Sequence, residues 1–256
     1  MGKRQNRNRN RRNKLKYLFN YNTSKKIGIV GNLSSHGRFG VGKKYMQYFS
    51  KFGNVQIINP LDEEIKDLDL LVLPGGADVD TKRYNQSPGL NTQKPDIFFE
   101  WFDNFVLPQY VEKNTPIFGI CRGMQSGSVF FGCELEQHVE NTYSVRSRGE
   151  LVDYVYPVNL DLIGVEGLDI FPSKRMTKVQ IEKLYKVNSL HHQVVDIDPE
   201  DRENDIVGLV FNALDNECEA VFNKNYPFFG VQWHPEELRN PQLSNILINH
   251  LLTLNS

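Results

Sequence analysis

Short apolar runs that alternate with longer amphipathic stretches constrain the fold of this chain more than any other feature. In the first half of the chain the apolar runs are residues 27–30, 55–58, 70–73 and 116–120. Residues 45–52 and 97–111 carry apolar side chains at helical spacing. Continuous apolar strands joined through helices imply a parallel sheet that is covered on both faces. We therefore predict an α/β fold of three layers, with a mostly parallel central sheet flanked by helices.

The second half of the chain is richer in strand-like segments. Beyond Gly132 these segments cover residues 151–158, 206–211, 218–222 and 228–231, and a last helix is predicted over residues 243–251. No internal repeat or linker divides residues 26–256, so we expect one domain there. Several aromatic and sulfur-bearing residues in apolar surroundings are predicted to be core residues: Phe98, Phe99, Trp101, Phe102, Phe105, Cys133 and Cys218.

Residues 1–25 are predicted to form a disordered basic arm. The first 26 residues hold ten Lys or Arg and no Asp or Glu, which leaves 20 basic against 31 acidic groups in the rest of the chain. Residues 2–16 combine Arg and Asn without apolar periodicity, so they cannot bury enough surface to offset the entropy of ordering. Three roles stay open for the arm: solubility, contact with nucleic acid through residues 1–16, and organelle targeting, which its scarcity of Ser disfavours.

Membrane and disulfide-rich proteins are disfavoured by the sequence. No apolar run approaches the roughly 18 to 20 residues of a bilayer span, and the N-terminus has no apolar core of the kind that a secretory signal needs. The three cysteines are odd in number and unrelated in spacing, which argues against a disulfide framework and a four-cysteine metal site. We predict a cytoplasmic protein that does not bind a membrane.

The sharpest local signal is the segment Gly119-Ile120-Cys121-Arg122-Gly123, which lies between a buried strand and a helix. Small residues two before and two after a nucleophile permit the tight strand-to-helix turn that lifts its side chain out of the sheet. A cysteine at this position also lies at a helix N-terminus, where the aligned N–H groups favour the thiolate. Taken alone, the segment is equally compatible with a buried structural cysteine. A base is needed to decide between them.

The segment Gly230-Val231-Gln232-Trp233-His234-Pro235-Glu236 supplies such a base. It follows a predicted strand, and on an extended backbone the side chains of His234 and Glu236 point the same way. Glu236 can then orient His234 and stabilise its positive charge. The sequence therefore predicts a nucleophile, base and acid in the order Cys121, His234, Glu236.

Glycines after another strand provide a candidate oxyanion hole. Pro74-Gly75-Gly76 follows residues 70–73, and glycine lets the main chain approach a substrate carbonyl closely. We expect Gly75 to face the substrate and Gly76 to aim an N–H at its carbonyl oxygen. The N–H of Arg122, the residue after the nucleophile, is the predicted second donor.

Four segments together resemble the class I glutamine amidotransferase-like superfamily, and within it the gamma-glutamyl hydrolase branch typified by gamma-glutamyl-gamma-aminobutyrate hydrolase. They are LVLPGGADVD at 71–80, PIFGICRGMQ at 116–125, VNSLHHQ at 187–193 and GVQWHPEE at 230–237. The resemblance runs from about Lys26 to the C-terminus. It implies a flavodoxin-like arrangement of the sheet, and the same roles for Cys121, His234 and Glu236.

The resemblance also implies where a glutamyl group binds. Gln125 and the main chain around Ser189, Leu190 and His191 are expected to hold its amino and carboxylate ends. Without the family, His191 and His192 are better explained as polar residues that cap a strand end, whereas the resemblance favours a pocket-lining place for at least one of them. No matching ligand spacing accompanies them to suggest zinc. No metal or organic cofactor is expected.

Three functions follow, and the first is favoured. Arg122, the Gly-Ala-Asp-Val run from Gly76 and the His-His-Gln triplet resemble stand-alone hydrolases that cleave a small gamma-glutamyl amine or glutamine through a thioester. The alternatives are a glutaminase component that delivers ammonia to a partner synthetase, and a nucleic-acid-binding protein that keeps an inactive body as a scaffold. Thr81 and residues 141–156 depart from the branch pattern, so the amine that leaves is open.

Overall fold

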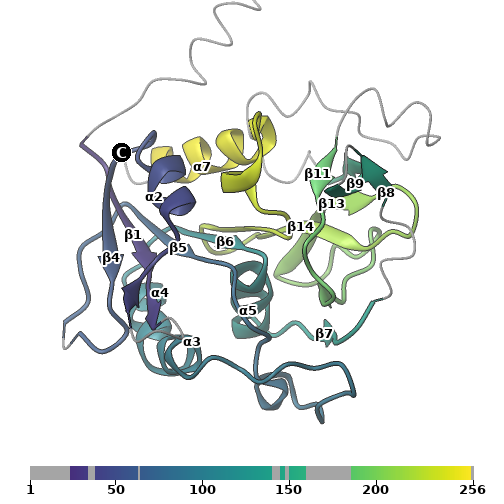
Figure 1. Cartoon of the computed structure of the whole chain (residues 1–256), viewed down its shortest axis with the longest axis horizontal. Helices are drawn as coiled ribbons and strands as arrows, with labels where there is room; N and C mark the ends of the chain where they lie inside the picture. Colours follow the sequence, from purple (N-terminus) through teal and green to yellow (C-terminus); the bar gives the residue numbers. More distant parts are fainter. Residues whose placement is uncertain are drawn as a thin grey trace, which may run out of the picture.

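A computed structural model describes residues 24–33, 38–62, 64–139, 145–147, 150–159 and 186–254 (Figure 1). The predicted basic arm, apart from Ser24 and Lys25, lies outside these residues. Among the described residues no helix is both long and apolar enough to cross a membrane.

A ten-stranded mixed sheet forms the centre of the molecule (Figure 1). Its first part consists of five neighbouring parallel strands, in the order β15 (Phe228–Val231), β6 (Ile117–Ile120), β5 (Leu70–Leu73), β1 (Lys26–Val30) and β4 (Asn54–Ile58). The remaining strands join beyond β15 in antiparallel pairs: β14 (Cys218–Asn223), β13 (Ile206–Asn212), β10 (Val155–Pro157), β12 (Val194–Val195) and β7 (Leu135–Glu136). The strand-rich second half predicted from the sequence is this antiparallel part.

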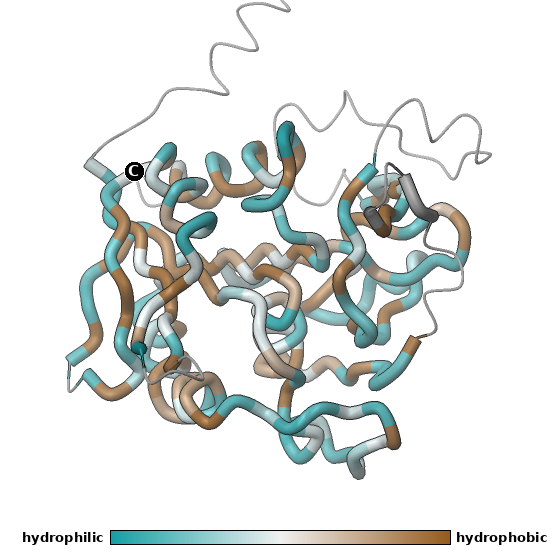
Figure 2. The backbone as a smooth tube through the Cα atoms, viewed as in Figure 1, coloured by the Kyte–Doolittle hydropathy of each residue, from teal (hydrophilic) through white to brown (hydrophobic). Residues whose placement is uncertain are grey.

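Helices cover both faces of the parallel part, as Figure 1 shows. On one face lie α2 (Lys43–Phe49) and α7 (Gln242–Leu254), and on the other lie α3 (Ile97–Trp101), α4 (Leu107–Glu112) and α5 (Arg122–Phe130). Strand β5 shows why both faces are apolar. Leu70 and Val72 pack in one core cluster, whereas Leu71 and Leu73 pack in the other. Figure 2 shows hydrophobic residues concentrated along these central strands.

Two smaller sheets accompany the large one. A three-stranded sheet joins β11 (Val187–Asn188), β9 (Glu150–Asp153) and β8 (Val145–Ser147), and a two-stranded one joins β2 (Asn32–Leu33) and β3 (Phe39–Gly40). The predicted strand over residues 151–158 is therefore two strands that belong to different sheets, β9 and β10. The chain changes sheets at Tyr154.

The helix predicted over residues 97–111 forms as three consecutive helical segments. A π-helical segment, Phe102–Val106, lies between α3 and α4. Phe99 and Phe102 are buried as predicted, but Trp101 and Phe105 are 46% and 57% exposed. The prediction that both are core residues was wrong. Five aromatic residues within eight positions cover more than the one face that a helix can press against a sheet.

Candidate active site

Cys121 occupies a strained turn between β6 and α5. Its backbone has φ 51° and ψ −112°, a conformation that residues with a side chain rarely adopt. The two flanking glycines are needed for packing: a Cβ on Gly119 would lie 2.5 Å from the carbonyl oxygen of Gly123, and one on Gly123 would lie 2.0 Å from that of Leu73. The segment thus has the geometry that a nucleophile elbow requires.

His234 reaches Cys121 because their two strands are neighbours. β15 and β6 pair in parallel, with Val231 opposite Ile120, so both strands end at the same edge of the sheet. This edge, at the carboxyl ends of parallel strands, is where open α/β sheets bind ligands. Asn188 holds the main chain of His234 in place. Its Oδ1 accepts from the His234 N–H at 2.8 Å, and its Nδ2 donates to the His234 carbonyl at 3.1 Å.

Glu236 pairs with the imidazole of His234, whose Nδ1 lies 2.7 Å from the carboxylate Oε1. The extended backbone predicted for this pair was wrong, because Pro235 starts a short 3₁₀ turn at Pro235–Glu237. Burial lowers the pKa of His234, but hydrogen bonds with Cys121 and Glu236 outweigh it and raise the pKa to about 10. With Nδ1 engaged by Glu236, Nε2 is left to exchange a proton with the sulfur.

The Pro-Gly-Gly turn lies against both His234 and Arg122. A Cβ on Gly75 would be 2.6 Å from Cε1 of the imidazole, and one on Gly76 would be 3.4 Å from Cδ of Arg122. Both glycines therefore line the space beside the imidazole and the elbow. The N–H of Gly75 donates to the hydroxyl of Tyr45 at 3.0 Å, and the same hydroxyl lies 3.3 Å from Nδ1 of His234. Tyr45 thus links the turn to the imidazole.

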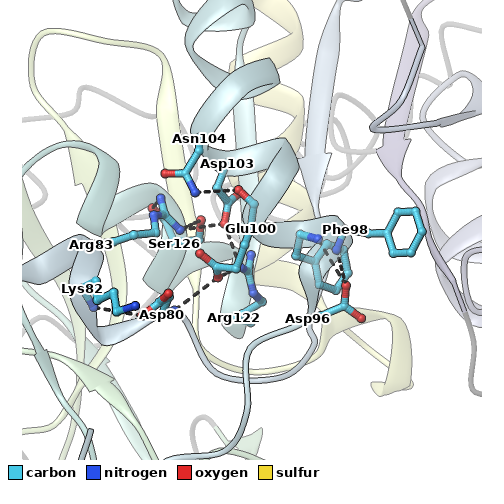
Figure 3. A network of polar contacts seen from close by, with 11 residues as sticks. Asp80, Lys82, Arg83, Asp96, Phe98, Glu100, Asp103, Asn104, Arg122 and Ser126 are labelled. Carbon is cyan, nitrogen blue, oxygen red and sulfur yellow. Dashed lines mark hydrogen bonds and ion pairs between the residues drawn. The ribbon is translucent and has the colours of Figure 1, made fainter. Parts of the chain in front are cut away.

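The side chain of Arg122 points into a buried set of charges that we name the arginine cluster: Arg83, Glu100, Asp103 and Arg122 (Figure 3). Arg122 Nη2 lies 2.8 Å from Glu100 and 2.7 Å from Asp103, and Arg83 Nη1 lies 2.7 Å from the same Asp103 oxygen. Burial would lower the pKa of Arg122, but the two carboxylates raise it. Two cations meet two anions here, and the cluster holds the side chain of the residue that follows Cys121.

The predicted glutamyl-binding residues occupy different surroundings. Gln125 is buried, and its amide nitrogen donates to the Gln193 carbonyl at 2.9 Å and to Gln232 Oε1 at 3.1 Å. Ser189 is buried and its N–H donates to the Leu151 carbonyl, whereas Leu190 is 60% exposed. Their predicted contact with a glutamyl group stays a prediction.

His191 is brought to two carboxylates from other strands. Its Nε2 lies 3.8 Å from Asp153 Oδ2, at the end of β9, and 3.6 Å from Glu219 Oε1 in β14. We name Asp153, His191 and Glu219 the carboxylate cluster. Burial would lower the pKa of His191, but both carboxylates and the charge of Cys121 raise it well above its usual value. The adjacent His192 has different partners. Its Nε2 lies 3.1 Å from Asp78 Oδ1, and its Nδ1 lies 3.3 Å from Nδ1 of His138.

Sequence reasoning assigned no role to several residues that support this site. Tyr45 and Asn188 contact His234, and Glu100 and Asp103 hold Arg122. Asn188 lies within the family-like segment at 187–193, so that segment was a signal for it. No local sequence pattern distinguishes the other three residues from their neighbours. They lie on helical segments among polar and apolar residues: Tyr45, Glu100 and Asp103.

Together these contacts assemble the parts of a covalent acyl-transfer site. A strained cysteine acts on the pKa of a histidine, the histidine is paired with a carboxylate, and glycine main chain lies beside the imidazole. The arrangement can support attack on a carbonyl carbon and proton transfer to a leaving group.

Comparison with known proteins agrees with the fold and the motifs. The family model for peptidase C26 matches residues 27–236. A glutamine amidotransferase-like protein of Lactococcus lactis, YvdE, is 30% identical over 224 residues, which cover 84% of this chain and 87% of YvdE. Gamma-glutamyl-gamma-aminobutyrate hydrolase PuuD of Escherichia coli is 27% identical over 244 residues, which cover 89% of this chain and 92% of PuuD.

Among solved structures, one chain of PurLQS from Thermotoga maritima superimposes with a TM-score of 0.57 at 15% identity, covering 91% of this chain and all of that one. At this identity the likeness concerns the fold alone. It confirms the predicted glutamine amidotransferase type of α/β fold. From the family match, the motifs and the fold together, the chain belongs to the peptidase C26 family of class I glutamine amidotransferase-like hydrolases.

Proposed function

We propose that this protein hydrolyses the gamma-glutamyl amide bond of glutamine or of a small gamma-glutamyl amine, with Cys121 as the nucleophile. The observation that carries the proposal is the linked set Cys121, His234 and Glu236, in which the imidazole is bonded to both partners and its pKa is raised to about 10. An imidazole with this pKa holds a proton at neutral pH, and that proton is available to a leaving amine.

The first half of the reaction forms a thioester. The Cys121 sulfur attacks the side-chain carbonyl carbon, and the oxygen becomes an oxyanion that the N–H groups of Gly76 and Arg122 stabilise. Losing one such donor typically costs about 3 to 4 kcal/mol of barrier. The C–N bond then breaks, and His234 gives its proton to the departing nitrogen, which leaves as ammonia or an amine.

The second half releases glutamate. His234, now neutral, takes a proton from water, and the hydroxide attacks the thioester carbon through a second oxyanion. The C–S bond breaks, and the thiolate and imidazolium are restored. Glu236 keeps Nδ1 protonated throughout, so that Nε2 performs both transfers.

Two observations support a gamma-glutamyl substrate. PuuD, a gamma-glutamyl-gamma-aminobutyrate hydrolase, aligns with 89% of this chain. The buried Gln125 lies one turn after the nucleophile, as the resemblance requires. Delivery of ammonia to a synthetase uses the same thioester chemistry and differs only in what happens to the leaving group.

The test measures glutamate release from L-glutamine and from a panel of gamma-glutamyl amines. Wild type, Cys121→Ala and the matched control Cys133→Ala are compared, and acyl-enzyme is sought by intact-mass spectrometry. We expect turnover of an amine conjugate by wild type and Cys133→Ala, and none by Cys121→Ala. Feeble glutaminase activity without conjugate hydrolysis would favour the synthetase-dependent alternative, and inertness of wild type toward every substrate would contradict the proposal.

A further inference from the structure

The carboxylate cluster lies where the two sheets of the second half meet. Asp153 ends β9 in the three-stranded sheet, Glu219 is in β14 of the ten-stranded sheet, and His191 follows β11. Their side chains are at most 1% exposed. The polar atoms of these three side chains are therefore shielded from bulk water at this junction.

The distances within the cluster are too long for hydrogen bonds. His191 Nε2 stands 3.8 Å from Asp153 and 3.6 Å from Glu219, beyond the usual 2.7–3.2 Å for a donor nitrogen and an acceptor oxygen. One donor atom from each residue lies within 4.8 Å of the others. Ligands about 2.0–2.1 Å from a tetrahedral ion stand about 3.4 Å apart, so the spacing suits atoms that share a central cation.

Glu219 points into this space without a hydrogen bond. The residue is 0% exposed, and neither of its carboxylate oxygens has a hydrogen-bond partner among the described residues. A buried carboxylate that lacks a partner costs several kcal/mol, so proteins pair such groups or use them to bind metal ions. The unpartnered carboxylate of Glu219 indicates a missing ligand independently of how close the three side chains lie.

The tautomer of His191 also suits a ligand. Its Nδ1 lies 3.2 Å from the Gln193 carbonyl oxygen, which can only accept, so Nδ1 carries a hydrogen there. That contact leaves Nε2 directed at the two carboxylates. A histidine that donates one ring N–H to a carbonyl and offers the other nitrogen to a metal is the common arrangement in metal sites.

The charge around the cluster points to a divalent ion. Asp215 interacts electrostatically with Glu219 and lies outside the set of three proposed ligands. Among the described residues, the imidazole of His191 lies near two carboxylates, those of Asp153 and Glu219. A mixed set of one imidazole and two carboxylates suits a first-row transition metal such as Zn²⁺ or Mn²⁺ better than Mg²⁺ or Ca²⁺.

We propose that Asp153, His191 and Glu219 bind a divalent transition-metal ion that ties the three-stranded sheet to the ten-stranded sheet. The three ligands come from distant segments, so spacing along the sequence gives no sign of them. The ion would hold the segment at 187–193, whose Asn188 fixes the main chain of His234. Its role is to position that segment, and no step of the reaction passes through it.

The test begins with the full chain carrying Cys121→Ala, so that the thiol cannot act as a ligand. The protein is stripped with a chelator and titrated separately with Zn²⁺ and Mn²⁺ in a calorimeter, and unstripped protein is analysed for metal by mass spectrometry. We expect about one equivalent of one ion with micromolar or tighter affinity. At a free concentration 100 times the Kd, the melting temperature should rise by roughly 5 to 10 °C.

Glu219→Gln in the same background should weaken binding at least 100-fold. Without metal this variant should melt at the same or a higher temperature than its parent, because a buried charge has been removed. Asp215→Asn is the matched control: it neutralises a neighbouring carboxylate outside the ligand set, and binding should change only a few-fold. His191→Gln provides a second ligand variant if Glu219→Gln does not fold.

Two results would overturn the proposal. One is a parent protein that binds neither ion more tightly than about 100 μM, in which case a protonated His191 balances the carboxylates. The other is unchanged affinity in a folded ligand variant, which would place the bound ion elsewhere, for example at His138 and His192. Because the titrations use an inactive Cys121→Ala protein, either result leaves the proposed hydrolysis untouched.

Discussion

The arginine cluster and the carboxylate cluster are two buried ionic assemblies close to Cys121, and they are built in opposite ways. In the arginine cluster, two guanidiniums and two carboxylates meet at 2.7–2.8 Å. In the carboxylate cluster, one imidazole faces its carboxylates at 3.6–3.8 Å. The first pairs two cations with two anions through short contacts, although Glu100 Oε2 and Arg122 Nε are buried without a hydrogen-bond partner among the described residues. Among the described residues, the second brings two carboxylates to one imidazole, and neither oxygen of Glu219 has a hydrogen-bond partner there.

The two clusters also support different halves of the site. The arginine cluster holds the side chain of the residue that follows Cys121. The carboxylate cluster holds the segment whose Asn188 fixes the main chain of His234. The difference teaches that a buried ion pair is informative about function only when its distances and charge balance are read together.

The largest effect should come from Cys121→Ala, which removes the proposed nucleophile while leaving both clusters intact. We expect turnover to fall by about 10⁴-fold or more, because no other group supplies the covalent step. The melting temperature should stay within a few degrees of wild type, since neither cluster loses a partner. Residual glutamate release within 10-fold of wild type would contradict the assignment.

Asp103→Asn should show that the two clusters differ in how much the loss of one charge lowers the free energy of unfolding. It removes a charge shared by two guanidiniums, Arg83 and Arg122, and breaking a buried pair on one side costs about 3 to 5 kcal/mol of unfolding free energy. Urea denaturation measures this loss. The comparison is Glu219→Gln without metal, whose free energy of unfolding should not fall. Equal losses in both variants would show that the two clusters do not differ as described.

Asn188→Ala tests whether the segment near the carboxylate cluster positions the base. The variant loses both hydrogen bonds to the His234 main chain, and we expect a cost of about 1 to 3 kcal/mol in stability. A shifted imidazole should lower kcat by about 10 to 100-fold with little change in KM. Asn245→Ala, which removes a hydrogen bond to Tyr48 away from the site, is the control and should keep kcat.

A further prediction concerns the pH dependence of stability that His234 contributes. Its pKa in the folded protein, about 10, lies above its ordinary value of 6.5, so the folded state binds the proton more tightly. The stabilisation is therefore complete below pH 6.5 and is lost as the pH rises through 10. At about 1.4 kcal/mol for each unit, this difference in pKa sets an upper bound of about 5 kcal/mol on the fall in unfolding free energy of wild type over this interval. The His234→Gln variant should not show this fall. If the unfolding free energies of the two proteins, measured by urea denaturation, change with pH in the same way, His234 is not the cause.

Local patterns predicted the elements of the parallel half well, because each strand there is buried on both faces and reads as an unbroken apolar run. β1, β4, β5 and β6 lie within a residue or two of the predicted runs. The antiparallel half was harder. Residues 151–158 form one apolar stretch in the sequence, and only pairing with β11 and β13 shows that it divides between two sheets.

The site shows the same division. Cys121, His234 and the Pro-Gly-Gly turn could be named from the sequence because each directly follows a strand, where the backbone itself sets the position. Tyr45 and Asp103 could not, because a helical residue acquires its partner only when the helix docks. Trp101 and Phe105 illustrate the reverse error, since helical spacing does not tell which side of an aromatic-rich helix meets the sheet.

The sequence by itself determined the α/β fold and the family, and it predicted Cys121 as the nucleophile and His234 as its base, since these depend on local periodicity and on motifs whose geometry is set within a few residues. Only the tertiary structure decided which charges share a buried space. Asp153, His191 and Glu219 belong to three separate segments, and their electrostatic interaction exists only once two sheets bring them within a few ångströms of one another. Interaction between charges depends on distance in space and on the exclusion of water, and neither is written in the order of residues along the chain.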